Sequence, residues 1–204
     1  MNPTTKSFLD FLNKFIPLSQ DEYDEFIIPC VTKRHFEKKS IITRAGEVEE
    51  YINFIESGLV RKYYKKENDE INTQISHEGH IIHAQESFHS RTPSEYTIET
   101  IEPTELTSIT FECLEKIYST SAKMERLGRL VITVTMVLKD KWQSQLVKLN
   151  PRERFIKFVT KHPELMQRVP QKYLASYLNI KPETFSRFKH MVKEYSKKII
   201  FHQN

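Results

Sequence analysis

The sequence contains little cysteine: Cys30 and Cys113 are the only two in 204 residues. They form no CxxC motif and no other spacing typical of metal ligands. We therefore expect two ordinary, partly buried thiols in a reducing compartment, which excludes a disulfide-stabilised fold and a cysteine-held iron–sulfur or zinc site.

Long apolar runs are also missing. No segment approaches the ~18 to 20 apolar residues that a membrane-spanning helix needs. The N-terminal segment MNPTTKSFLDFLNKF lacks the basic flank, continuous apolar stretch and cleavage site of a signal peptide. Apolar residues make up 38% of the chain and charged residues 28%. This balance predicts a soluble, cytoplasmic globular protein with no membrane partner.

The net charge of +4 hides an asymmetry between the two halves of the chain. Residues 1–115 contain 12 Lys and Arg against 21 Asp and Glu, a net charge of −9. Residues 116–204 contain 19 against 6, a net charge of +13. A basic half joined to an acidic half indicates that the C-terminal half meets a polyanion such as nucleic acid, although a solvated basic surface would give the same count.

Short strands dominate the first half after two lead-in helices, which are expected at Ser7–Phe15 and after Ser19. Turn residues such as Ala45-Gly46, Asn68-Asp69 and Glu78-Gly79 separate the strands. Ser57-Gly58 is a typical tight-hairpin turn. The pattern predicts an antiparallel sandwich or barrel. Its strands are expected at 35–43, 51–56, 59–65, 70–77, 81–84, 96–101 and 105–110.

A short helix is expected at Glu112–Tyr118, and a long one at Ala122–Leu149, which contains no proline. At 1.5 Å per residue the long helix measures ~40 Å, more than the width of a small β domain. It either covers the flank of its own domain or pairs with a second copy of the chain. We expect a dimer seam made by an apolar stripe with steps of four, three and four: Leu127, Val131, Val134 and Leu138.

Asn150-Pro151 ends the long helix, and a further helix is expected at Arg152–Lys161. The segment VPQKYLASYLNIKPETFSRFKHMVKEY then has the apolar spacing of a helix-turn-helix. Its first helix is expected at Gln171–Leu178, with Leu174, Ala175 and Leu178 inward. Its second begins at Pro182, with Phe185, Phe188 and Val192 inward. The polar residues suited to contact bases and phosphates of double-stranded DNA are Lys172, Lys181, Glu183, Thr184, Ser186, Arg187, Lys189 and His190.

The segments FIESGLVRKYY, PSEYTIETIE and VPQKYLASYLNIKPETFSRFK, in this order, resemble the Crp/Fnr transcription regulators over nearly the whole chain. The resemblance implies an α+β fold: an antiparallel β-roll of the cyclic-nucleotide-binding type, a dimerisation helix and a C-terminal winged-helix or helix-turn-helix domain. The expected divisions are 1–120, 121–149 and 150–204. The tail KKIIFH is a candidate start of the wing. A homodimer on DNA is implied, with RNA polymerase as a further candidate partner.

Recognition helices of this family often contain Arg-Glu-Thr followed by an arginine three residues later. Here the matching residues are Pro182, Glu183, Thr184 and Arg187. Glu183 and Arg187 therefore inherit base-contacting roles by resemblance. Pro182 replaces the first arginine, so one guanine contact is missing and the preferred DNA sequence should differ.

Cyclic-nucleotide-binding members hold the ligand with a Gly-Glu-Leu and a following Arg-Ser-Ala. Aligned with HAQESFHSRTPSEY, the family's glycine, glutamate and arginine correspond here to His83, Ala84 and Ser94. Without that arginine a buried phosphate loses its charge-assisted pairing, and Arg91 is the one nearby substitute. We expect that cyclic AMP does not bind and that no cofactor is held, and the sequence identifies no other small-molecule effector. The candidate pocket residues are Ala84, Glu86, Ser87, Arg91, Ser94 and Glu95.

Four histidines, His77, His80, His83 and His89, lie within thirteen residues of one another. Imidazoles beside Glu86 are a possible metal set, but alternate residues of a strand face opposite ways, so we predict rim histidines and no metal. Two alternatives to a non-enzymatic transcription regulator remain. One is a cupin-like metal enzyme with His83 and Glu86 as ligands. The other is a small-molecule or metal-binding sensor that acts on a protein partner.

Overall fold

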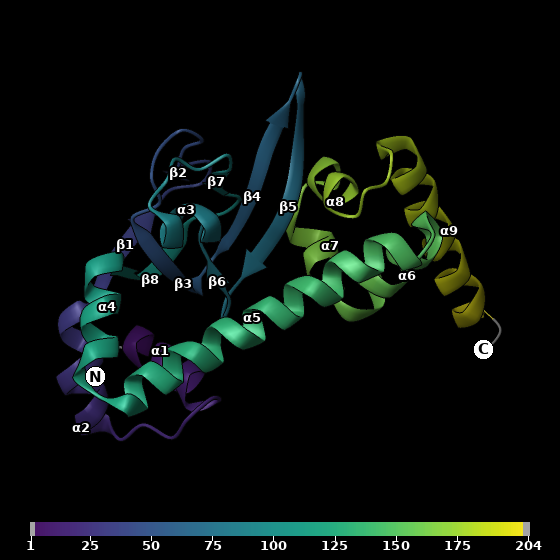
Figure 1. Cartoon of the computed structure of the whole chain (residues 1–204). Coiled ribbons are helices and arrows are strands. Elements are labelled where there is room, and N and C mark those ends of the chain that lie inside the picture. Colours follow the sequence, from purple (N-terminus) through teal and green to yellow (C-terminus); the bar gives the residue numbers. More distant parts are fainter. Residues whose placement is uncertain (1–2, 202–204) are drawn as a thin grey trace. The chain divides into compact units, whose positions relative to one another are not determined.

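The computed structural model describes the backbone of residues 3–201 and the side chains of residues 8–191. The chain divides into two compact units. The first unit comprises Met1–Asp69 and Thr73–Val137, and the second comprises Glu70–Asn72 and Leu138–Asn204. The division falls inside one continuous helix, α5 (Ala122–Lys148), which Figure 1 shows as a single unbroken coil. Each unit is described separately below.

The first unit contains the β-roll, built from two four-stranded antiparallel sheets. One sheet has the order β1-β8-β3-β6 and the other β2-β7-β4-β5. Apolar side chains from both sheets meet in a small core between them, including Ile55, Val60, Ile98 and Leu106. The strands are β1 (Thr32–Phe36), β2 (Ile41–Thr43), β3 (Tyr51–Ser57), β4 (Leu59–Lys66), β5 (Asp69–His77), β6 (Ile81–Ile82), β7 (Thr97–Thr100) and β8 (Thr104–Thr110).

Two details of the strand prediction are wrong. The strand expected at 35–43 is interrupted, because Lys39 has a positive φ of 64° and the chain turns there from one sheet to the other. Ser57-Gly58 does not close a hairpin, since β3 and β4 belong to different sheets. Gly58 instead makes the corner between the sheets at φ 103°, where an added Cβ would lie 2.4 Å from the Thr104 hydroxyl.

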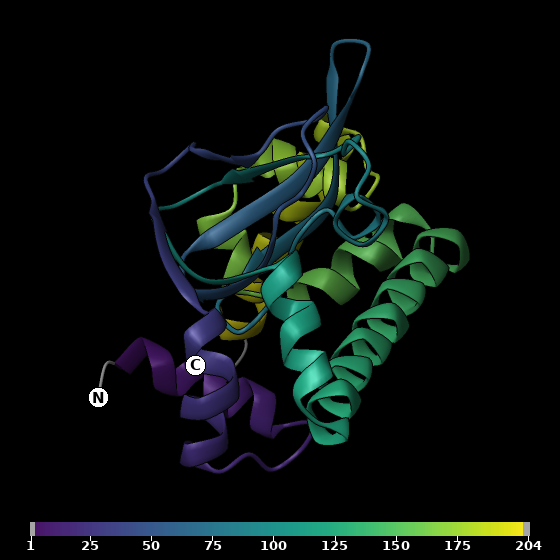
Figure 2. The ribbon, with the colours of Figure 1, turned by 60° about the vertical axis from the view of Figure 1, so that its left-hand side comes forward.

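Helices cover the outer face of the β1-β8-β3-β6 sheet. They are α1 (Pro3–Asn13), α2 (Gln20–Glu22), two short turns η1 (Tyr23–Ile27) and η2 (Ile28–Cys30), and α4 (Phe111–Thr120). Figure 2 shows α1, α2 and α4 gathered with the start of α5 at one end of the roll. Phe8 of α1 packs on Phe54 of β3 with ring centroids 5.1 Å apart. This core also buries Met124 and Leu127 of α5.

The second unit is helical in its described part after residue 137. It contains the end of α5, then α6 (Pro151–Lys161), α7 (Leu165–Arg168), α8 (Gln171–Tyr177) and α9 (Pro182–Phe201). Asn150 caps α6 in a reciprocal pair with Glu153, and Pro151 occupies the first turn as predicted. The expectation that Lys197 begins a wing strand is wrong, because α9 runs to Phe201; His202 lies outside the described residues.

Both cysteines lie in the first unit and carry free thiols. Cys30 is buried, and its Sγ donates to the carbonyl of Cys113 at 3.5 Å. Desolvation and the neighbouring Cys113 raise the pKa of Cys30 to about 11, so the thiol stays protonated at neutral pH. Among the described residues, no helix is long and apolar enough to cross a membrane.

Candidate functional site

Helices α8 and α9 form the predicted helix-turn-helix. Leu174, Ala175 and Leu178 are buried, as expected, and Phe185 of α9 is fully enclosed. The turn places Asn179 in the left-handed conformation at φ 50°, which asparagine tolerates better than most residues. Phe188 is partly buried, while the side chain of Val192 lies outside the described residues. The apolar spacing read from the sequence therefore does form this unit's core.

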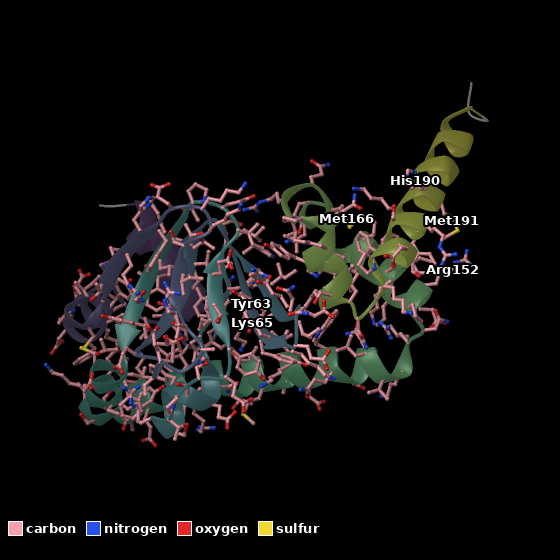
Figure 3. All side chains as sticks on the ribbon, turned by 90° about the horizontal axis from the view of Figure 1, so that it is seen from above. Tyr63, Lys65, Arg152, Met166, His190 and Met191 are labelled. Atoms are coloured by element: carbon pink, nitrogen blue, oxygen red, sulfur yellow. The ribbon has the colours of Figure 1, made fainter. Side chains whose placement is uncertain are left out.

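The opposite face of α9 is polar and open to solvent. Glu183, Arg187 and His190 are exposed and follow one another at steps of four and three, so they share one stripe of the helix. Arg187 Nη2 donates to the hydroxyl of Thr184 at 3.2 Å, which holds these two side chains together. Figure 3 shows His190 on α9. Lys172 and Lys181 are also exposed, whereas Ser186 and Lys189 are partly buried.

Arg154 of α6 is a positioning residue that the sequence analysis did not identify. It is 8% exposed, and its guanidinium donates only to backbone carbonyls. Nε reaches Leu178 and Nη2 reaches Asn179, both at 2.8 Å, while Nη1 reaches Leu146 at 3.1 Å and Leu149 at 2.7 Å. One cation thus satisfies the C-terminal carbonyls of α5 and α8 and holds the turn of the helix-turn-helix.

The apolar stripe of α5 divides into two parts. Leu127 and Val131 are buried in the core of their own unit, so these two members of the expected dimer seam pack inside the chain. Val134 is 42% exposed and Leu138 is 58% exposed. Val137, which lies on the same side of the helix, is 46% exposed. The stripe therefore changes from core to exposed surface along its length.

The candidate effector segment folds around a helix, α3 (Gln85–Ser90), that the strand pattern did not predict. Its first turn is anchored by Glu49, a carboxylate that is 1% exposed. Glu49 Oε2 accepts from the Ala84 N–H at 3.1 Å and from the Thr43 hydroxyl at 3.0 Å, and Oε1 accepts from the Tyr51 N–H at 3.2 Å. Burial raises the pKa of Glu49, and these donors oppose that rise.

The predicted pocket residues take different positions around α3. Ala84, Ser87 and Ser94 are buried, and both hydroxyls are engaged by backbone groups. Glu86 and Glu95 are exposed. Arg91 forms a two-pronged ion pair with Glu50 at 2.8 Å and donates to the Glu49 carbonyl at 2.8 Å. Its guanidinium is thus held by acceptors from the protein itself.

Lys62 is a buried cation that the sequence analysis missed. It lies on β4 in phase with Val60 and opposite Ile98 of β7, both of which belong to the core between the sheets. Its ammonium donates to the His83 carbonyl at 3.2 Å, just before α3. The alternation in LVRKYYKK carried the signal, because residue 62 has the same parity as the inward Val60.

The clustered histidines separate into two pairs. The rings of His77 and His80 lie 4.1 Å apart between centroids, and those of His83 and His89 lie 5.9 Å apart. Within the described residues, no three ligand atoms drawn from His77, His80, His83, His89 and Glu86 come close enough together to share one ion. The geometry offers no support for the cupin-like metal site.

Comparison with known protein families agrees with this arrangement. Residues 33–121 match the family model of the cyclic nucleotide-binding domain. This segment begins in β1, spans the rest of the roll and α3, and ends after α4. No curated protein matches the chain at a significant level.

Solved structures extend the likeness to the helical part. FixK2 from Bradyrhizobium japonicum superposes with a TM-score of 0.70 at 16% identity, covering 81% of this chain and 86% of that one. The c-di-GMP responsive global regulator CLP from Xanthomonas campestris gives 0.66 at 17% identity, covering 87% and 93%. A structure from Eubacterium rectale, described as a transcriptional regulator of the Crp/Fnr family, gives 0.65 at 18%, covering 89% and 88%. This chain has the Crp/Fnr fold.

The β-roll, the long helix and the C-terminal helices each have a counterpart in the Crp/Fnr fold. The β-roll with α3 matches the model of the cyclic nucleotide-binding domain, and the superposed structures extend the similarity through the long helix α5 to the helical hairpin of α8 and α9. The α+β fold class predicted from the sequence is therefore confirmed, including the order of its parts. At identities below 20%, these superpositions show the fold alone.

Proposed function

We propose that this protein is a transcription regulator that binds a two-fold-related DNA operator as a homodimer. The observation that carries the proposal is the exposed stripe of Glu183, Arg187 and His190 on α9, presented by a helix-turn-helix with a fully buried core. An arginine on such a helix donates to guanine O6 and N7 together, and a glutamate accepts from cytosine N4. The surplus of positive charge in residues 116–204 supports attraction to the phosphate backbone.

The test is operator selection from random duplexes, followed by anisotropy titrations on the selected sequence. Arg187→Ala should weaken binding by ~1 to 3 kcal/mol at one base pair and relax the preference there. Arg187→Lys should lose most of the same preference, because lysine keeps the charge without the planar fork. Arg44→Ala, which removes an exposed arginine from the first unit, is the matched control and should leave specificity unchanged.

If Arg187→Ala leaves both affinity and sequence preference intact, α9 is not the recognition helix. A protein that shows no salt-dependent shift with any selected duplex would favour the alternative, in which the helical hairpin docks on a protein partner.

The proposed dimer seam is the exposed apolar stretch of α5 formed by Val134, Val137 and Leu138. A second copy laid against the same stripe would remove these side chains from water, which a continuous apolar patch on a long helix favours. Leu138→Glu should shift the protein from dimer to monomer in sedimentation velocity. Met136→Glu is the matched control, because Met136 is equally exposed at 57% but lies on the other side of the helix. Equal effects of the two changes would reject this seam.

Cyclic AMP is not the effector in this proposal. By the family resemblance, Ser94 aligns with the phosphate-binding arginine. The nearby Arg91 is paired with Glu50. A buried phosphate would therefore lack its charge-assisted partner. Titration calorimetry should show no heat of binding with cyclic AMP at micromolar concentrations, and a saturating signal there would overturn this part of the proposal.

The regulator would act without catalysis, in the cytoplasm where its DNA is found. Contact with RNA polymerase remains a prediction from the family resemblance. The operator titrations above decide first whether there is a DNA complex for a polymerase to meet.

A further inference from the structure

An apolar cavity of about 70 Å³ lies in the first unit, on the outer side of the β1-β8-β3-β6 sheet. This volume is several times the ~10 to 15 Å³ that one water molecule requires. The sheet forms its floor and α1, α3, α4 and α5 supply its walls. Its lining includes Phe8 of α1, Phe54 and Ile109 of the sheet, Leu114 of α4, and Met124 and Leu127 of α5.

Among the residues whose side chains the structure describes, none of those lining the cavity is a Lys, Arg, Asp or Glu. Its few polar groups are Thr107, Tyr118 and His89. The Thr107 hydroxyl is already hydrogen-bonded to the carboxylate of Glu56, and the ammonium of Lys33 reaches it at 2.5 Å. His89 is exposed at the rim, and desolvation of its ring lowers its pKa, which favours the neutral imidazole. A charged ligand would find no counter-ion here, and a strongly polar one would lose its hydration.

We infer that this cavity binds a small, uncharged, largely apolar molecule, such as a monocyclic aromatic compound. An apolar ligand would restore the contacts that the apolar lining lacks while the space holds no packed side chain. The site is separate from the interior of the β-roll, where Lys62 and Glu49 lie.

The cavity gives such a ligand direct contact with α5. Met124, Leu127, Gly128, Val131 and Ile132 all line it, and together they span more than two turns of that helix. The same helix continues into the exposed stretch proposed as the dimer seam. A bound molecule would therefore stabilise the first half of α5 in its packed position. The role of the bound molecule as an effector rests on the proposed function, whereas its binding to the cavity does not.

Toluene is a suitable probe, with benzoate as a charged control of similar shape. For the full-length protein, toluene should give a saturable heat of binding in calorimetry and raise Tm by several degrees at saturation. Benzoate at the same concentration should do neither. If toluene gives no saturable signal with the folded wild-type protein, the site does not exist as proposed.

Leu127→Phe should fill the cavity and abolish toluene binding. Leu130→Phe is the matched control, since it makes the same change on the same helix at a residue outside the lining. A folded Leu127→Phe protein that still binds toluene with wild-type affinity would place the ligand elsewhere and overturn the inference. Should Leu127→Phe fail to fold, Leu114→Ala provides the second readout. It enlarges the cavity, so naphthalene should gain affinity relative to toluene, and an unchanged ratio would contradict the assignment.

DNA titrations separate the proposed DNA-binding function from the proposed ligand site in the cavity. Toluene binding without any DNA binding would reject the regulator function and keep the cavity as a ligand site. DNA binding without toluene binding would do the reverse.

Discussion

Arg154 Nη2 donates to the carbonyl of Asn179 at 2.8 Å, which joins α6 to the left-handed turn of the helix-turn-helix. The other guanidinium nitrogens donate to Leu178 and to the last turn of α5. A planar group with five donors suits this role, because it satisfies several carbonyls from one position. The orientation of α9 therefore depends on a buried residue that lies outside the exposed stripe of that helix.

Arg154→Ala should destabilise the second unit by about 2 to 4 kcal/mol, because four carbonyls lose their donor. Arg154→Lys should recover part of this loss, since an ammonium cannot reach all four. Unfolding in urea, followed by the fluorescence of Trp142, measures the effect, because the Trp142 ring stacks on Tyr177 of α8 at 4.3 Å. Arg152→Ala is the control: Arg152 is exposed on α6 (Figure 3), and its loss should cost less than ~0.5 kcal/mol.

Glu49→Gln should destabilise the first unit by about 1 to 3 kcal/mol at pH 7. Each carboxylate oxygen accepts a hydrogen bond from a backbone N–H, and the amide NH2 of glutamine would place a donor against one of these two donors. Burial raises the pKa of Glu49 above its ordinary 4.5, so the folded protein binds this proton more tightly than the unfolded chain. Protonation of Glu49 therefore adds to the free energy of unfolding. This contribution is fully present below pH 4.5 and is lost as the pH rises through the pKa of Glu49 in the folded protein.

The advantage of the wild-type protein over Glu49→Gln should therefore be larger at pH 4.5 than at pH 7.5. Urea unfolding of both proteins at the two pH values measures this difference. Glu37→Gln, at an exposed carboxylate of the same unit, serves as the control and should follow the wild-type pH profile. An advantage that grows with rising pH would contradict the assignment.

Gly128→Ala should destabilise the protein by about 1 to 3 kcal/mol, although alanine is normally favoured over glycine inside a helix by about 1 kcal/mol. A Cβ at this position would lie 2.1 Å from Cε1 of Tyr118, whose ring packs directly on the backbone of α5. Burial and the nearby Glu115 raise the pKa of Tyr118 to about 12, as expected for an enclosed phenol. In a Tyr118→Ala background the ring is absent, so Gly128→Ala should become stabilising. Thermal unfolding of the wild type, the two single variants and the double variant measures this.

Lys172→Ala and Lys181→Ala should each weaken DNA binding to all sequences alike. Each change removes about one phosphate contact, so the slope of log affinity against log salt should fall by about 1. Titrations at several salt concentrations measure the slope. A change in base preference, with an unaltered slope, would mean that these lysines contact bases instead.

The sequence alone was sufficient where the pattern is local. The step of four from Leu174 to Leu178 and the step of three from Phe185 to Phe188 predicted a helical hairpin with an apolar inner face. Pro151 and Pro182 marked the starts of α6 and α9. Helix periodicity and proline geometry act over a single turn, so neighbouring residues determine them. The strands of the roll were recognisable for the same reason, through their alternation and turn residues.

The tertiary structure decided what depends on residues far apart in the chain. Ser57-Gly58 looks like a hairpin turn, but β3 and β4 pair with other strands, so it became a corner between sheets. Leu127 and Leu138 belong to one stripe, yet the first is buried beneath the roll and the second is exposed, because only part of α5 is covered. Arg154 and the cavity beside α5 have no local signal of function, and the alternation of β4 places Lys62 inward without showing what its ammonium contacts. Their surroundings exist only after distant segments pack, since burial and hydrogen-bond partners are properties of the fold and not of the sequence around a residue.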